Sequence, residues 1–119
     1  MQKHIVHWQG VPPDKRRQWN IIFALSQEGV HVSGCCPVCG GANLHRYYHI
    51  GRPVSRSIEG QQFIAEGALW EWCSQCHVYE HAHALVPAWW QGPIFALQTV
   101  TAEPAVLDQL IQDMNNKAG

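Results

Sequence analysis

The chain has 119 residues, a length that one hydrophobic core usually serves, and 46% of the residues are apolar while 14% are charged. This balance excludes a typical disordered chain, which is rich in charge and poor in apolar groups. The formal net charge of −1 excludes a surface that is basic throughout, as in proteins that coat nucleic acid.

Residue patterning predicts two helices that flank a set of short strands, in one α+β domain over residues 1–119. Trp19, Ile22 and Phe23 follow the i, i+3, i+4 spacing of a helix with one apolar face. A second helix begins near Pro104, since proline is tolerated in a first turn, and we interpret its apolar stripe as core packing. The expected elements in chain order are a strand at 4–8, a helix from 14 to a stop at 29, a strand at 43–50, a polar loop or hairpin tip at 51–60, strands at 68–73 and 77–86, a loop at 87–93, a strand at 94–100 and a helix from 104.

Two Cys-x-x-Cys pairs are the strongest motif in the sequence. Cys36 and Cys39 form the first pair, and Cys73 and Cys76 form the second. Two residues between cysteines let both thiolates of a tight turn face one ion, and two such turns complete a tetrahedron. Four sulfur ligands suit one structural Zn²⁺ and leave no coordination position for a catalytic water. We therefore predict one structural zinc site and no enzymatic activity.

Disulfides or buried free thiols are the alternative interpretation of these cysteines. The sequence has no apolar stretch long enough for an export signal or a membrane span, which predicts a reducing cytoplasm and no membrane partner. Paired cysteines more often hold metal than form disulfides in that compartment. Cys35 is the spare cysteine, which we interpret as a small buried thiol, with exchange for Cys36 as a ligand left open.

The first cysteine pair carries a resemblance to a known family. Cys-Pro-Val-Cys-Gly at 36–40 resembles the first knuckle of zinc-ribbon domains, and the second pair is similar to their second knuckle. The resemblance covers about residues 34–86 and implies a small antiparallel sheet around one Zn²⁺. Zinc ribbons serve in transcription, translation, enzyme appendages and protein docking. His77 stands where glycine is common in this family, so we expect a less regular second turn.

A second resemblance involves Leu-Trp-Glu-Trp-Cys at 69–73 and Val-Pro-Ala-Trp-Trp at 86–90. This combination is similar to small bacterial zinc-ribbon immunity proteins, which are encoded beside secreted or contact-dependent toxins. The resemblance implies a cytoplasmic, non-catalytic protein that binds and neutralises one cognate toxin.

Charge is unevenly distributed along the chain. Residues 1–56 hold seven of the eight Lys and Arg residues and have a net charge of +5, whereas residues 57–119 have a net charge of −6. An acidic surface complements a basic cleft, which favours a toxin with a basic active-site face as the partner. Tryptophan is enriched in interface hot spots, although a loop that folds back and buries its tryptophans is an equal alternative. The predicted partner contacts are Trp89, Trp90, Glu71 and Glu80.

Nucleic acid is the alternative partner, and a metal-dependent enzyme is the third class considered. Interleaved cations and aromatics are typical of single-strand binding surfaces, and a nucleic-acid-binding zinc ribbon would act in transcription or a related process. This pattern occurs at Arg46, Tyr48, Arg52 and Arg56. An enzyme would need a titrating histidine cluster or a second ion. The candidates are His77, His81 and His83 on one strand face, which we interpret instead as a partly solvated aromatic surface.

Overall fold

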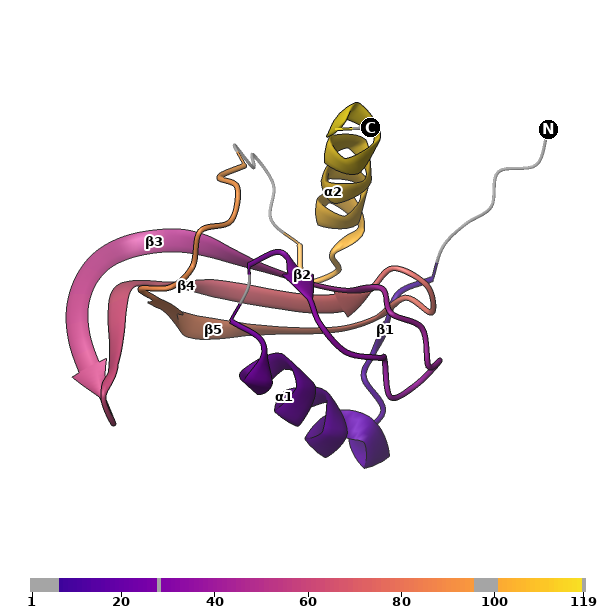
Figure 1. Ribbon diagram of the computed structural model, residues 1–119, viewed down its shortest axis with the longest axis horizontal. Coiled ribbons are helices and arrows are strands. Elements are labelled where there is room, and N and C mark those ends of the chain that lie inside the picture. Colours follow the sequence, from indigo (N-terminus) through magenta and orange to yellow (C-terminus); the bar gives the residue numbers. More distant parts are fainter. Residues whose placement is uncertain (1–6, 28, 96–100, 119) are drawn as a thin grey trace.

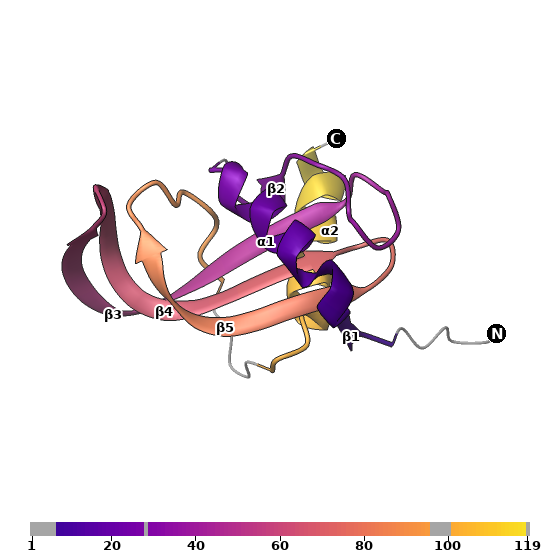
Figure 2. The same ribbon diagram turned by 90° about the horizontal axis from the view of Figure 1, so that it is seen from below.

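The computed structural model describes residues 7–27, 29–95 and 101–118. In this part of the chain a five-stranded sheet carries one helix on each face, with α1 (Arg16–Leu25) below and α2 (Ala105–Ala118) above in Figure 1. Figure 2 shows the same arrangement from below, with α1 crossing the sheet. The strands in spatial order are β1 (Gln9–Gly10), β5 (Val78–Pro87), β4 (Gln61–Cys73), β3 (Leu44–Ile58) and β2 (His31–Val32). The α+β class is confirmed, and the sheet is antiparallel except for the parallel pair of β1 and β5.

The β3–β4 hairpin is longer than predicted and takes up most of the segment expected as a polar loop. Its turn is the two-residue Glu59–Gly60, where both residues have positive φ, at 50° and 82°. The sequence pattern hides this extension because Pro53 and the surrounding polar residues resemble a loop. Register shifts on both sides of Pro53 accommodate the proline, and the hairpin curls away from the rest of the sheet (Figure 1).

The short strands also differ from the prediction. The strand expected at 4–8 lies mostly outside the described residues, and the strand that pairs with β5 begins at Gln9. β2 was not predicted, because a two-residue strand carries no periodicity; it pairs with the start of β3. Of the strand expected at 94–100, residues 94 and 95 are irregular and the rest lie outside the described residues.

The sheet separates two hydrophobic clusters. On the α1 side, Trp19 and Phe23 lie in one cluster with Leu44 and with two of the paired cysteines, Cys36 and Cys73. This is the apolar helical face that the sequence predicts. Burial of Trp19, which has no exposed surface, therefore couples α1 to the ends of the strands that carry the cysteines.

On the α2 side, Trp70 and Trp72 are fully buried and share a cluster with Leu107 and Ile111 of the helix. Asp108 joins α2 to the second cysteine turn, since its carboxylate accepts hydrogen bonds from the indole of Trp72 at 2.9 Å and from the hydroxyl of Ser74 at 2.7 Å. Neither helix in the described residues combines the length and the apolar character needed to cross a membrane.

Candidate functional site

The four paired cysteines converge on one point between the loop before β3 and the β4–β5 turn. Their sulfur atoms all lie within 4.8 Å of one another, and the Sγ–Sγ distances of Cys36 to Cys76 and of Cys39 to Cys73 are both 3.7 Å. A tetrahedral Zn²⁺ with Zn–S bonds of about 2.3 Å places its sulfurs about 3.8 Å apart. The donor set therefore fits a metal ion such as Zn²⁺, and these cysteines are free rather than disulfide-bonded.

The two cysteine turns have the same backbone design. In the first, the amide of Gly40 donates to the carbonyl of Cys36 at 2.8 Å; in the second, the amide of His77 donates to the carbonyl of Cys73 at 3.0 Å. Gly40 and His77 both have positive φ, at 79° and 62°. The second turn is thus as regular as the first, contrary to the expectation from the missing glycine. His77 bears the strain of a left-handed conformation while its ring packs edge-on against Trp8 at 4.9 Å.

Backbone amides and burial act on the hydrogen bonding and the pKa of these cysteine sulfurs. The amide of Val38 donates to the sulfur of Cys36, and that of Gln75 to the sulfur of Cys73, both at 3.4 Å. Burial, followed by contacts with the other cysteines, raises the pKa of Cys76. A bound metal ion reverses such a shift, because a coordinating thiol loses its proton. Cys35 is exposed, so the interpretation of it as a buried thiol is wrong.

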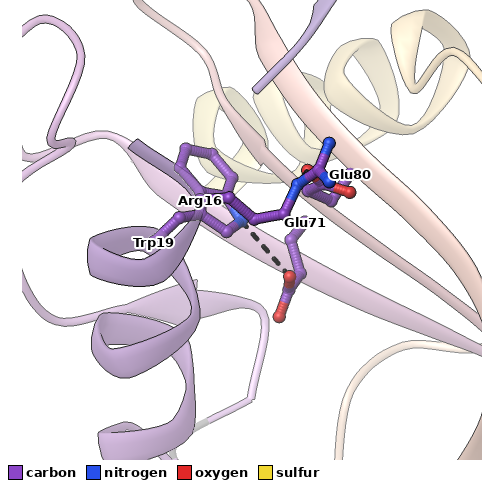
Figure 3. Close-up of polar contacts among 4 residues, drawn as sticks. All are labelled: Arg16, Trp19, Glu71 and Glu80. Carbon is purple, nitrogen blue, oxygen red and sulfur yellow. Dashed lines mark hydrogen bonds and ion pairs between the residues drawn. The ribbon is translucent and has the colours of Figure 1, made fainter. Parts of the chain in front are cut away.

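The two acids predicted as partner contacts lie opposite each other on β4 and β5, on the sheet face that α1 covers (Figure 3). The Glu71 carboxylate accepts a hydrogen bond from the indole of Trp19 at 3.2 Å, and Glu80 is paired with Arg16 at 3.2 Å. Burial raises the pKa of Glu71 to about 7, against the opposing effects of the Trp19 hydrogen bond and the charge of Arg46. Glu71 is therefore a half-buried carboxyl with an internal partner rather than a freely exposed acid.

The charges that are segregated in the sequence meet in the fold. Within the described residues, each ion pair joins an arginine of the basic first half to a glutamate of the acidic second half. Besides Arg16 with Glu80, both Arg52 and Arg56 contact Glu66, at 2.8 Å and 3.8 Å. The +5 and −6 halves thus neutralise each other in part and do not form two separate charged surfaces.

The loop with the tryptophan pair folds back onto the sheet. Trp90 is 6% exposed and contacts Tyr47 and Tyr48 edge-on, and Gly92 lies so close to its ring that no side chain fits there. Trp89 is half-buried and covers the guanidinium of Arg46 at 4.8 Å. The role of these tryptophans as partner contacts stays a prediction, and in this conformation Trp89 offers the larger surface.

The residues of the predicted nucleic-acid surface are divided by the fold. Arg46 is 3% exposed and donates to the carbonyls of Phe23 and Ser26 at the C-terminal end of α1. Tyr48 is buried, whereas Arg52 is exposed and paired with Glu66. Arg46 holds the C-terminal end of α1 against the sheet, because its buried guanidinium donates to helix carbonyls that have no partner within the helix.

Replacing Arg46 with methionine keeps the apolar stem but removes both donors, and we expect a loss of about 2 kcal/mol of unfolding free energy. Urea unfolding of the metal-loaded protein measures this loss. The matched variant Arg52→Met removes an exposed guanidinium, and its expected change is below about 0.5 kcal/mol. Equal effects of the two substitutions would show that Arg46 does not clamp the helix.

Among the described residues, no histidine belongs to a group of three or more potential metal ligands. His81 stacks on Trp70 with ring centroids 4.2 Å apart, and His77 lies in the second cysteine turn. A closer pair, which was not predicted, lies on β2 and β3, where the Nδ1 atoms of His31 and His45 are 3.1 Å apart. Burial and the neighbouring His31 lower the pKa of His45 to about 4, so this ring is neutral at physiological pH. Their adjacent positions on β2 and β3 could have indicated this pair only if β2 had been recognised.

Comparison of the chain with models of known protein families, with curated proteins and with solved structures finds no match. Two features of the described residues bear on function: the four-sulfur centre and the acidic pair on the sheet face that α1 covers.

Proposed function

We propose that the chain is a non-catalytic protein-binding module of the zinc-ribbon type, held together by one structural Zn²⁺. The observation that carries this proposal is the spacing of the four sulfurs, which fits a closed tetrahedral site. Zn²⁺ bound there would fasten the loop before β3 to the β4–β5 turn. A closed sulfur site has no position for a water nucleophile, so the metal contributes to folding and not to chemistry.

Two features of the α1 side support a protein as the partner. Ile21 and Leu25 are exposed and lie four residues apart, on one side of α1. The cavity beside the helix is lined by Glu71 and Glu80, whose charge would repel phosphate. Protein interfaces combine apolar and polar groups of this kind.

The resemblance to bacterial immunity proteins gives the proposal its most specific form. The partner is then a toxin with a basic face, and the chain occludes that face in the cytoplasm. Complementary charge across such an interface accelerates association and excludes wrong partners.

Proteins encoded next to the gene for this chain are the partners to test. Each is produced alone and together with the chain, and binding to the purified zinc-loaded chain is measured by calorimetry. We expect one of them to arrest growth when produced alone, to lose that effect in the presence of the chain, and to bind it directly. Absence of binding by every neighbour would contradict the proposal, as would retardation of DNA or RNA by the chain at low salt.

A further inference from the structure

β5 forms one margin of the sheet, and β1 covers only the start of its outer edge (Figure 2). The last contact between the two strands is the amide of Val11, which donates to the carbonyl of Tyr79 at 3.1 Å. Backbone groups of successive residues in a strand point to opposite sides, and the register of β5 with β4 is continuous from Tyr79 to Val86. The N–H and C=O groups of the odd-numbered residues that follow Tyr79 therefore point away from β4.

Three residues of β5 present these outward-pointing backbone groups: His81, His83 and Leu85. Within the described residues, the backbone hydrogen bonds on this side of β5 end at Tyr79, so the three N–H and three C=O groups have no protein partner. Pro87, which ends β5, has no N–H to donate. The open edge of β5 is thus the segment 80–86, between the contact with β1 and Pro87.

The opposite margin of the sheet, along β3, is protected against pairing with another chain. It carries Pro53, register shifts on both sides of that proline, and the exposed Arg52 and Arg56. Proline, bulges and charge are the features by which natural proteins block exposed strand edges. Between Glu80 and Pro87 the open edge of β5 has none of these features, and the first three residues after Glu80 are exposed. The open edge can therefore accept a second strand that continues the sheet.

We propose that two copies of the chain pair antiparallel through the open edge of β5 and form one continuous sheet across a two-fold axis. His83 then faces His83 of the second copy, and His81 of each copy faces Leu85 of the other. Each of these three facing pairs exchanges two main-chain hydrogen bonds. The dimer does not depend on the proposed function, because it uses the edge of the sheet and not α1.

Symmetry, length and charge favour a second copy as the occupant of the open edge. The outward-pointing residues are spaced evenly around His83, so one antiparallel register satisfies all of their backbone groups. The space between β1 and Pro87 has the length of the strand that fills it, because both are the segment 80–86. Antiparallel pairing also keeps the two Glu80 side chains at opposite ends of the new ladder, where each faces Val86 of the other copy.

Sedimentation equilibrium of the zinc-loaded chain tests the dimer. We expect the weight-average mass to rise with concentration from that of one chain, 13.5 kDa, to that of two. His83→Pro removes the central outward donor and leaves the hydrogen bonds to β4 intact, because proline is tolerated where an edge N–H faces solvent. We expect His83→Pro to weaken dimerisation about ten-fold or more, and His83→Lys to do the same by placing two cations opposite each other. Ser57→Lys, which adds the same charge at an exposed position of β3, is the matched control and leaves dimerisation unchanged.

Amide hydrogen exchange measured by NMR locates the interface residue by residue. The amides of His81, His83 and Leu85 should exchange rapidly at concentrations where the chain is monomeric and slowly where it is dimeric. The amides of Ala82 and Ala84 point to β4 and should exchange slowly at both concentrations. This alternation distinguishes pairing through the open edge from any other contact between two copies.

The outcomes that contradict the dimer are distinct from those that contradict the proposed function. A mass of one chain at all concentrations up to about 1 mM would overturn the dimer, as would dimerisation of His83→Lys equal to that of the wild type. A dimer in which the outward-pointing amides still exchange rapidly would overturn pairing through the open edge. Protection of those amides only when a protein encoded by a neighbouring gene is added would overturn the second copy as the occupant and support the proposed function.

Discussion

Replacement of Cys73 by serine is expected to abolish stoichiometric metal binding and to remove the cooperative unfolding transition of the chain. Cys73 is a buried member of the four-sulfur centre and packs in the same cluster as Trp19 and Phe23. Structural Zn²⁺ contributes about 10–16 kcal/mol of apparent binding free energy in zinc-finger peptides. The total stability of a small domain is about 5–15 kcal/mol, so loss of the metal exceeds what the remaining core can supply.

Metal analysis and thermal unfolding followed by circular dichroism measure both effects. Cys35→Ser is the matched control, because Cys35 is an exposed neighbour of the first pair and lies outside the four-sulfur centre. It should retain one metal ion per chain and an unchanged melting temperature. A Cys73→Ser variant that keeps its metal, or a Cys35→Ser variant that loses it, would refute the assignment of ligands.

The cysteine centre was predictable because its signal is local. Each pair needs only two intervening residues and a tight turn to face one ion. Cys36 and Cys39, and likewise Cys73 and Cys76, have this spacing in the sequence. The apolar face of α1 was predictable for the same reason, since helical periodicity places Trp19 and Phe23 on one side. The regular geometry of the turn at His77 was not predictable, because tertiary packing with Trp8 holds a non-glycine residue in a left-handed conformation.

The surroundings of Glu71 could not be predicted because they depend on contacts distant in sequence. The indole that caps its carboxylate comes from a residue 52 positions earlier, and Arg46 and Glu80 approach it from the two neighbouring strands. Period-two alternation indicates that these residues share a face, but not that a helix will cover it. The same dependence on distant contacts explains the outcome for charge. The charge asymmetry of the two halves predicted an acidic surface, whereas the fold pairs arginines of the first half with glutamates of the second half.

The burial of Glu71 predicts a pH-dependent gain of stability on its replacement by glutamine. Burial raises its pKa in the folded chain to about 7, whereas in the unfolded chain the carboxyl titrates in its usual range near 4.5. The folded state therefore favours the protonated carboxyl, and this group's contribution is fully present below the unfolded pKa and is lost as the pH rises to about 7. The difference of two to three pKa units corresponds to about 3 kcal/mol.

Glutamine cannot ionise, and its carbonyl still accepts the hydrogen bond from Trp19. Glu71→Gln should consequently exceed the wild type in unfolding free energy by up to about 3 kcal/mol at about pH 8.5, and by less than half of that at about pH 5.5. Urea unfolding of the zinc-loaded proteins at both pH values measures the difference, in which the shared titration of His45 cancels. Glu66→Gln, whose carboxylate is exposed and already paired with arginines, controls for the loss of one negative charge. If Glu71→Gln has the same effect at both pH values, the pKa of Glu71 is the same in the folded and the unfolded chain. Burial against α1 would then not disfavour the ionised carboxylate.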